Sequence, residues 1–176
     1  MGNTTVVSSE RGRTLLWRIR AVMAFFIVAL VASGLTAIPV EAELNAVASV
    51  LGLPPQANPQ DYSGLPHWIA RIREGIRDTN ARHPFIAYGF DWLAFAHVVL
   101  GILFIGPLRD PVRNRWVITF GMIACVLVVP WAFIFTPIRG LPRFWALIDS
   151  AFGVFGVIPL WLCRRWAIEL GTLGAA

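Results

Sequence analysis

Two aspartates lie inside apolar stretches of the sequence, where a charged side chain needs a chemical reason to be present. Asp91 comes shortly after Pro84 and Asp149 shortly after Phe144, each near the start of a long apolar run. A carboxylate within a membrane costs about 2.5–3.5 kcal/mol on insertion scales. We therefore expect both acids to face the interior of a helix bundle, at similar depth, and to find partners there.

Arginine is the cation best suited to pair with a carboxylate, and two arginines fall just above both acids. The sequence predicts a polar pocket open to the outer side. Its candidate residues are Asp91, Asp149, Arg139, Arg143, His97, Tyr88 and Trp131. Two interpretations remain open: ion pairs that only hold helices together, and a pocket that binds a ligand or carries out a reaction.

His97 lies near the middle of the second apolar run, about 120° around the helix from Asp91. A haem held by two histidines would need a second intramembrane histidine on another helix, and His67 and His83 both lie outside the apolar runs. We therefore expect no haem and no other cofactor. His97 is interpreted as a packing histidine with a hydrogen bond, or as a proton relay.

The two cysteines, Cys125 and Cys163, both fall in apolar runs. Their spacing matches no zinc, redox or disulfide pattern, so we expect small buried residues and no metal site. The sequence contains no phosphate loop, nucleophile elbow or HExxH motif. No catalytic residue is assigned, and whether the chain is an enzyme stays open.

Four apolar runs must position these residues. Hydrophobic residues make up 57% of the chain and charged residues only 14%. Each run has about 20 residues, enough to cross a hydrocarbon core of roughly 30 Å, and only a helix satisfies its own backbone in lipid. The predicted fold is all-α, a four-helix transmembrane bundle in a single membrane domain over residues 1–176. The spans are residues 21–40, 84–106, 116–136 and 144–163.

The first run has features of a secretory signal peptide. It follows a basic segment, and Val40-Glu41-Ala42 resembles a cleavage site. Its apolar part is longer than the 7–15 residues usual for such peptides. We therefore interpret it as an uncleaved transmembrane helix.

The arginines predict the orientation of the helices. The net charge of +5 comes from arginine alone, because the chain has no lysine. Arginines flank the apolar runs in the N-terminal tail, in the loop 107–115 and after residue 163. With four transmembrane helices, these three segments lie on the same side of the membrane. Positive charge marks that side as cytoplasmic, so both termini are expected there. This placement argues against nucleic-acid binding.

The outer segment, residues 41–83, contains one amphipathic helix. Leu65, Ile69, Ile72 and Ile76 form an apolar stripe at helical spacing. The polar residues expected on the other faces are Arg71, Arg73, Glu74, Arg77 and Asp78. We expect this helix to lie on the extracytoplasmic membrane surface or to cap the bundle.

Two short strings carry a family resemblance. Residues 106–111 (GPLRDP) and 149–153 (DSAFG) are similar to strings in uncharacterised small inner-membrane proteins of bacteria. The resemblance covers about the last hundred residues. It implies a four-helix protein of the bacterial inner membrane and brings no activity and no assigned site.

These features favour an integral membrane binding protein or accessory subunit with a polar pocket in the outer leaflet. One alternative is a small membrane enzyme acting on a lipid or apolar substrate, with Asp91 or His97 as acid or base. Another is a purely structural subunit of a membrane complex. The expected partners are the lipid bilayer, a lipid or apolar ligand, and a membrane protein or a second copy of the chain.

Overall fold

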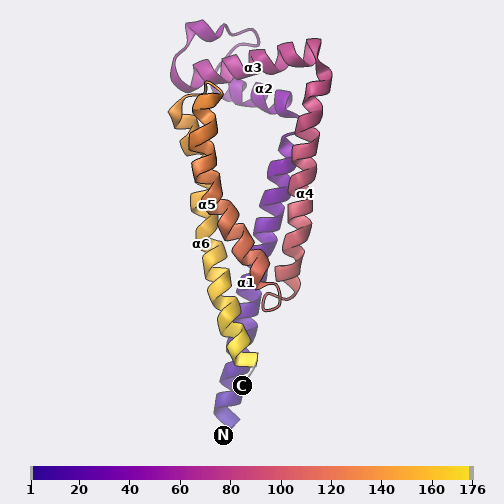
Figure 1. Cartoon of the computed structure of the whole chain (residues 1–176), viewed down its shortest axis with the longest axis vertical. Helices are drawn as coiled ribbons and strands as arrows, with labels where there is room; N and C mark the ends of the chain where they lie inside the picture. The colour runs from indigo at the N-terminus through magenta and orange to yellow at the C-terminus, as the bar shows by residue number, and fades with distance from the viewer. Residues whose placement is uncertain (1, 175–176) are drawn as a thin grey trace. The chain divides into compact units, whose positions relative to one another are not determined.

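The computed structural model describes residues 2–174, and every regular element in this part of the chain is a helix (Figure 1). In chain order they are α1 (Gly2–Thr36), α2 (Val40–Val50), η1 (Pro59–Asp61), α3 (Gly64–Arg82), η2 (Pro84–Ala87), α4 (Tyr88–Arg109), α5 (Arg115–Ile138) and α6 (Arg143–Gly174). Four segments are long and apolar enough to cross a membrane: Glu10–Thr36, Pro84–Arg109, Arg115–Ile138 and Arg143–Leu173. The all-α fold with four such helices is confirmed.

The first long helix ends earlier than its apolar run. α1 stops at Thr36, a turn follows, and α2 begins at Val40. Pro39 explains the break, because proline has no amide hydrogen to donate and disfavours helical conformation in the residue before it. The chain turns here before α2 begins.

The structure divides into two compact units, each described by itself. Unit 1 comprises Met1–Val28 and Gly101–Ala176, and unit 2 comprises Ala29–Leu100. Unit 1 therefore holds α5, α6 and parts of α1 and α4. Unit 2 holds α2, α3 and the remaining parts of α1 and α4.

Unit 1 is built around the α5–α6 hairpin. Gly153 of α6 lies so close to α5 that an added Cβ would collide with the carbonyl oxygen of Cys125. The turn between the two helices is a Schellman motif: Leu141 N–H donates to the Thr136 carbonyl (2.9 Å), and Gly140 adopts a φ of +69°. Glycine reaches this left-handed conformation without steric cost. The close approach and the turn together set how the two helices pair.

Part of α1 completes the core of unit 1. Ile19 and Met23 are fully buried, and the Phe26 ring packs against Phe104 with centroids 5.0 Å apart. Cys163 is fully buried and Cys125 is 2% exposed, so the prediction of two buried cysteines is confirmed.

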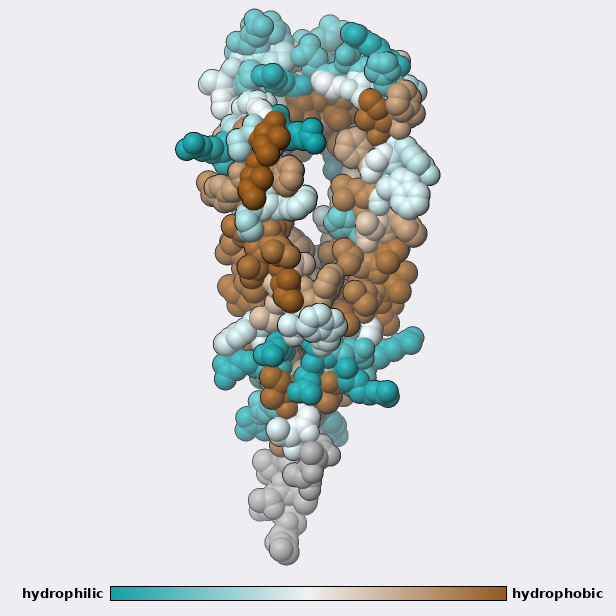
Figure 2. Space-filling view, viewed as in Figure 1, coloured by the Kyte–Doolittle hydropathy of each residue, from teal (hydrophilic) through white to brown (hydrophobic). Residues whose placement is uncertain are grey.

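Arginines gather at one end of unit 1, where Figure 2 shows hydrophilic side chains around the α4–α5 turn. Arg20 donates to the carbonyls of Leu108 and Arg109, two groups that the end of α4 leaves without helical partners. Arg11 pairs with Glu169 of α6 at 2.5 Å. These contacts join α1 to α4 and to α6.

Unit 2 contains the outer segment, in which α3 lies across the direction of α4 (Figure 1). α3 contains the residues of the predicted apolar stripe, and one of them, Ile69, is only 6% exposed. Its placement at a membrane surface stays a prediction. Arg73 was expected on a polar face, and this is wrong: it is only 4% exposed. It follows Ile69 by one helical turn, so it shares the buried face, where backbone carbonyls take up its guanidinium.

Candidate functional site

Four side chains of α4 form the most distinctive surface in unit 2, which we call the Asp91 face. They are Tyr88, Asp91, Trp92 and Phe95. Steps of three and four residues along a helix place side chains on one face. Together these residues line a shallow pocket of about 240 Å³.

The aromatic rings of the Asp91 face stack edge to face. The Tyr88 and Trp92 ring centroids are 6.0 Å apart, with the ring planes at 87°. The Trp92 and Phe95 ring centroids are 5.6 Å apart, with the ring planes at 85°. All three side chains are more than half exposed, at 60%, 55% and 57%. Asp91 is also exposed and lies in the first turn of α4, where the helix dipole favours a negative charge.

Unit 2 is described in full, and Asp91 takes part in neither of its ion pairs, which join Arg77 to Glu41 and Arg82 to Asp78. The structure therefore presents a carboxylate without a cationic partner from its own unit, flanked by aromatic rings. Such a surface can attract a cation through charge and through the negative faces of the rings.

Four of the seven predicted pocket residues belong to unit 1. Arg139 ends α5 and Arg143 begins α6, and both are exposed. Asp149 is exposed on α6, and among the described residues of unit 1 it forms no ion pair with either arginine. Trp131 is 65% exposed, and its ring packs against the Phe135 ring with centroids 4.4 Å apart. The grouping of these four side chains in one pocket stays a prediction.

Asp91, Tyr88 and His97 belong to unit 2, so a pocket shared between Asp91 and Asp149 stays a prediction. Within unit 2, Tyr88 and Asp91 do share one surface. Trp92 and Phe95 were not among the predicted residues of this surface. Their spacing from Tyr88 and Asp91 was the available signal, because all four fall on one helical face.

His97 lies where α1 meets α4. Its Nδ1 is 2.8 Å from the Leu93 carbonyl oxygen, which can only accept, so Nδ1 carries the hydrogen. A Cβ added at Gly34 would collide with the Cβ of His97 and would lie 3.3 Å from the Ala94 carbonyl oxygen. This geometry agrees with a packing histidine that uses one ring nitrogen for a hydrogen bond.

A second pocket, of about 530 Å³, lies between α3 and the loop of residues 55–58. Arg73 donates to the carbonyls of Pro54 (2.5 Å) and Pro55 (3.0 Å), and Arg77 donates to Pro55 (3.3 Å). Both guanidinium groups are engaged in fixing the loop. We therefore interpret this pocket as a consequence of how the loop is anchored to α3.

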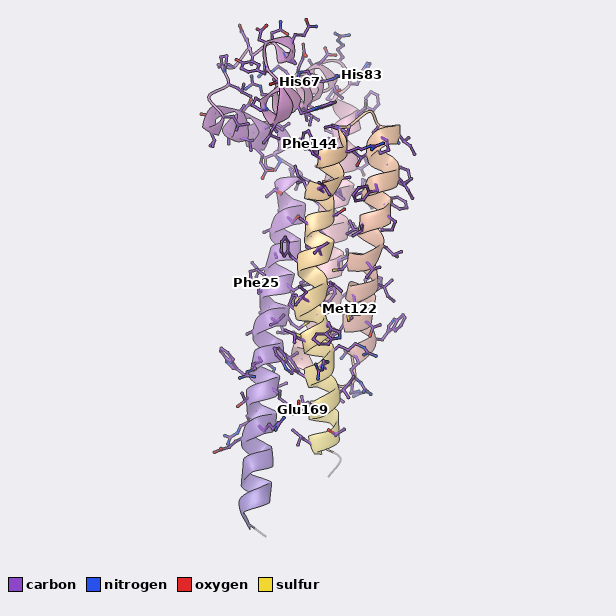
Figure 3. All side chains as sticks on the ribbon, turned by 90° about the vertical axis from the view of Figure 1, so that its left-hand side faces the viewer. Phe25, His67, His83, Met122, Phe144 and Glu169 are labelled. Atoms are coloured by element: carbon purple, nitrogen blue, oxygen red, sulfur yellow. The ribbon has the colours of Figure 1, made fainter. Side chains whose placement is uncertain are left out.

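The histidines outside the apolar runs also have local partners. His67 places Nδ1 2.7 Å from the Pro59 carbonyl, and the His83 ring packs near Phe85 with centroids 5.9 Å apart. Figure 3 labels both histidines in the region of α3. Within residues 2–174, no three His, Cys, Asp or Glu side chains lie together in a way that would hold a metal ion.

Comparison with known proteins adds no family. No protein-family model, no curated protein and no solved structure matches the chain. Any function must therefore be inferred from the sequence and from the geometry of the side chains.

Proposed function

We propose that the chain is a small multi-pass binding protein of a bacterial inner membrane, with its ligand site in the outer leaflet at the Asp91 face. Four helices of sufficient length and apolarity support the insertion in a membrane. Arginines are grouped beside the helix ends on the side that carries both termini, and positive charge favours the cytoplasm, which supports cytoplasmic termini. The family resemblance of residues 106–111 and 149–153 supports the bacterial inner membrane.

One observation carries the binding function. An exposed carboxylate, Asp91, lines one shallow pocket together with three exposed aromatic rings near the outer end of an apolar helix. A lone acid on a lipid-facing surface would cost several kcal/mol or would become protonated. A bound partner that supplies positive charge removes this cost, which gives the acid a reason to be there.

The test compares what is bound to the purified chain and to an Asp91→Asn variant. Both proteins are extracted in the same mild detergent, and their small-molecule content is determined by mass spectrometry. We expect at least one molecule to be enriched with the original chain and lost from the variant, while both proteins elute as folded species. Identical contents would contradict a binding site at Asp91.

The same experiment tests the predicted pocket between the two acids. If Asp149 shares the site, Asp149→Asn should lose the same molecule as Asp91→Asn. If Asp149 only contributes to stability, its variant should keep the molecule and unfold at a lower temperature.

A further inference from the structure

We infer that the ligand of the Asp91 face is a phospholipid whose headgroup carries a primary ammonium group, phosphatidylethanolamine. This inference rests on the proposed function, because it names the ligand class for the same site. It follows from three features of unit 2: the partners of its arginines, the aromatic rings, and the apolar path that leads away from Asp91.

All four arginines of unit 2 are engaged with partners other than Asp91. The Arg71 guanidinium lies over the Trp68 ring at 5.2 Å, and Arg73 donates to backbone carbonyls. Arg77 and Arg82 pair with other acids at 3.8 Å and 2.7 Å. A cation for Asp91 therefore comes from outside the unit, and the headgroup ammonium of a surrounding lipid is the source that this inference assigns.

The rings beside Asp91 suit an ammonium group in particular. Tyr88 and Trp92 are 60% and 55% exposed, and a cation within about 6 Å of an aromatic ring face is attracted by the ring quadrupole. A primary ammonium also donates charge-assisted hydrogen bonds to a carboxylate, which a quaternary ammonium cannot do. Aromatic rings and carboxylate thus act on the same group.

The surface beyond Asp91 selects a lipid over a soluble amine. Along α4 the same face continues through Phe95 to Val99, which are 57% and 45% exposed. With the headgroup at Asp91, an acyl chain runs along these apolar side chains. A soluble amine would leave this apolar surface without a partner.

The experiment is native mass spectrometry of the full chain in detergent, with equal amounts of phosphatidylethanolamine and phosphatidylglycerol that carry the same acyl chains. We expect ethanolamine lipid to bind about tenfold better, the ratio that corresponds to about 1.4 kcal/mol. Asp91→Asn should remove this preference. Trp92→Leu should weaken binding about two- to fivefold, the range expected for one exposed cation–π contact.

The matched control is Trp116→Leu. Trp116 is also an exposed tryptophan, at 69%, but it lies on α5, which contains no acidic residue, and outside the predicted pocket. Its replacement should leave the lipid preference unchanged. Free phosphoethanolamine in excess should not displace the lipid, because it has no acyl chain. Displacement would show that the ligand is a soluble amine and would overturn the inference.

The outcomes separate this inference from the proposed function. If ethanolamine lipid is not preferred but another molecule still depends on Asp91, the lipid assignment is overturned and the binding site remains. If no bound molecule depends on Asp91, both are overturned. If Asp91→Asn aggregates, Trp92→Leu decides, and an unchanged lipid preference in that variant overturns the inference.

Discussion

Replacing Gly153 by alanine tests the packing that organises unit 1. The added Cβ would collide with the carbonyl oxygen of Cys125 and with a methyl group of Val128. The methyl group can rotate away, but the carbonyl belongs to the backbone of α5. The collision is therefore relieved only if the two helices move apart.

The expected size of the effect follows from two opposing terms. Alanine gains about 1 kcal/mol over glycine in helix propensity. Overpacking costs about 1–3 kcal/mol and occasionally more, and a backbone contact belongs at the upper end of this range. The net effect is a loss of about 2 kcal/mol, which lowers the unfolding temperature of a chain of this size by about 4–8 °C.

The assay is thermal unfolding of the purified chain in detergent, with Gly75→Ala as the matched control. Gly75 lies inside α3, and a Cβ there would meet nothing within 4 Å. Gly75→Ala should therefore stabilise the chain slightly, by about 0.5–1 kcal/mol. If Gly153→Ala unfolds at or above the temperature of the original chain, the close approach of α5 and α6 is refuted.

The proposed orientation predicts that a cysteine placed at Gln60 in a cysteine-free background reacts with an impermeant maleimide added to intact cells, and labelling only after lysis would reverse the orientation. Ile69→Asp should destabilise the chain, because Ile69 is 6% exposed and burying such a side chain contributes about 1.5–3 kcal/mol; unchanged thermal stability and protease sensitivity would argue against the packing of α3. Arg73→Met keeps the side-chain stem but removes the donors to Pro54 and Pro55, so we expect faster proteolysis of the loop 54–58 and a loss of about 1–3 kcal/mol. An equal cleavage rate in the variant would mean that these hydrogen bonds do not hold the loop.

The four long helices could be predicted because length and apolar composition alone require them. No information about the partners of a helix is needed for that step. The helix boundaries were harder to predict from the sequence. Pro39 signals the break after α1, but α1 also extends well before the apolar run that begins at residue 21. The polar N-terminal part of α1 includes Arg11, whose contact with Glu169 joins distant parts of the sequence.

Arg73 shows why parts of the outer segment could not be predicted. Its spacing from Ile69 placed it on the buried face, but charge normally excludes arginine from such a position. The carbonyls of Pro54 and Pro55 make its burial possible, and their position depends on the fold of the loop. Phe95 is a different case, because helical spacing alone places it beside Asp91 and the apolar run concealed its role.

The joined ends of α1 and α6 have a consequence for how the protein responds to bilayer thickness. These helices have 35 and 32 residues, about 52 Å and 48 Å at 1.5 Å per residue, well beyond a hydrocarbon core of roughly 30 Å. Arg11 pairs with Glu169, and the Phe26 ring packs near Phe152 with centroids 6.1 Å apart. Neither helix can shift along its axis past the other without breaking these contacts. In the proposed membrane placement, a thinner bilayer would therefore tilt α6 and the unit 1 part of α1 together.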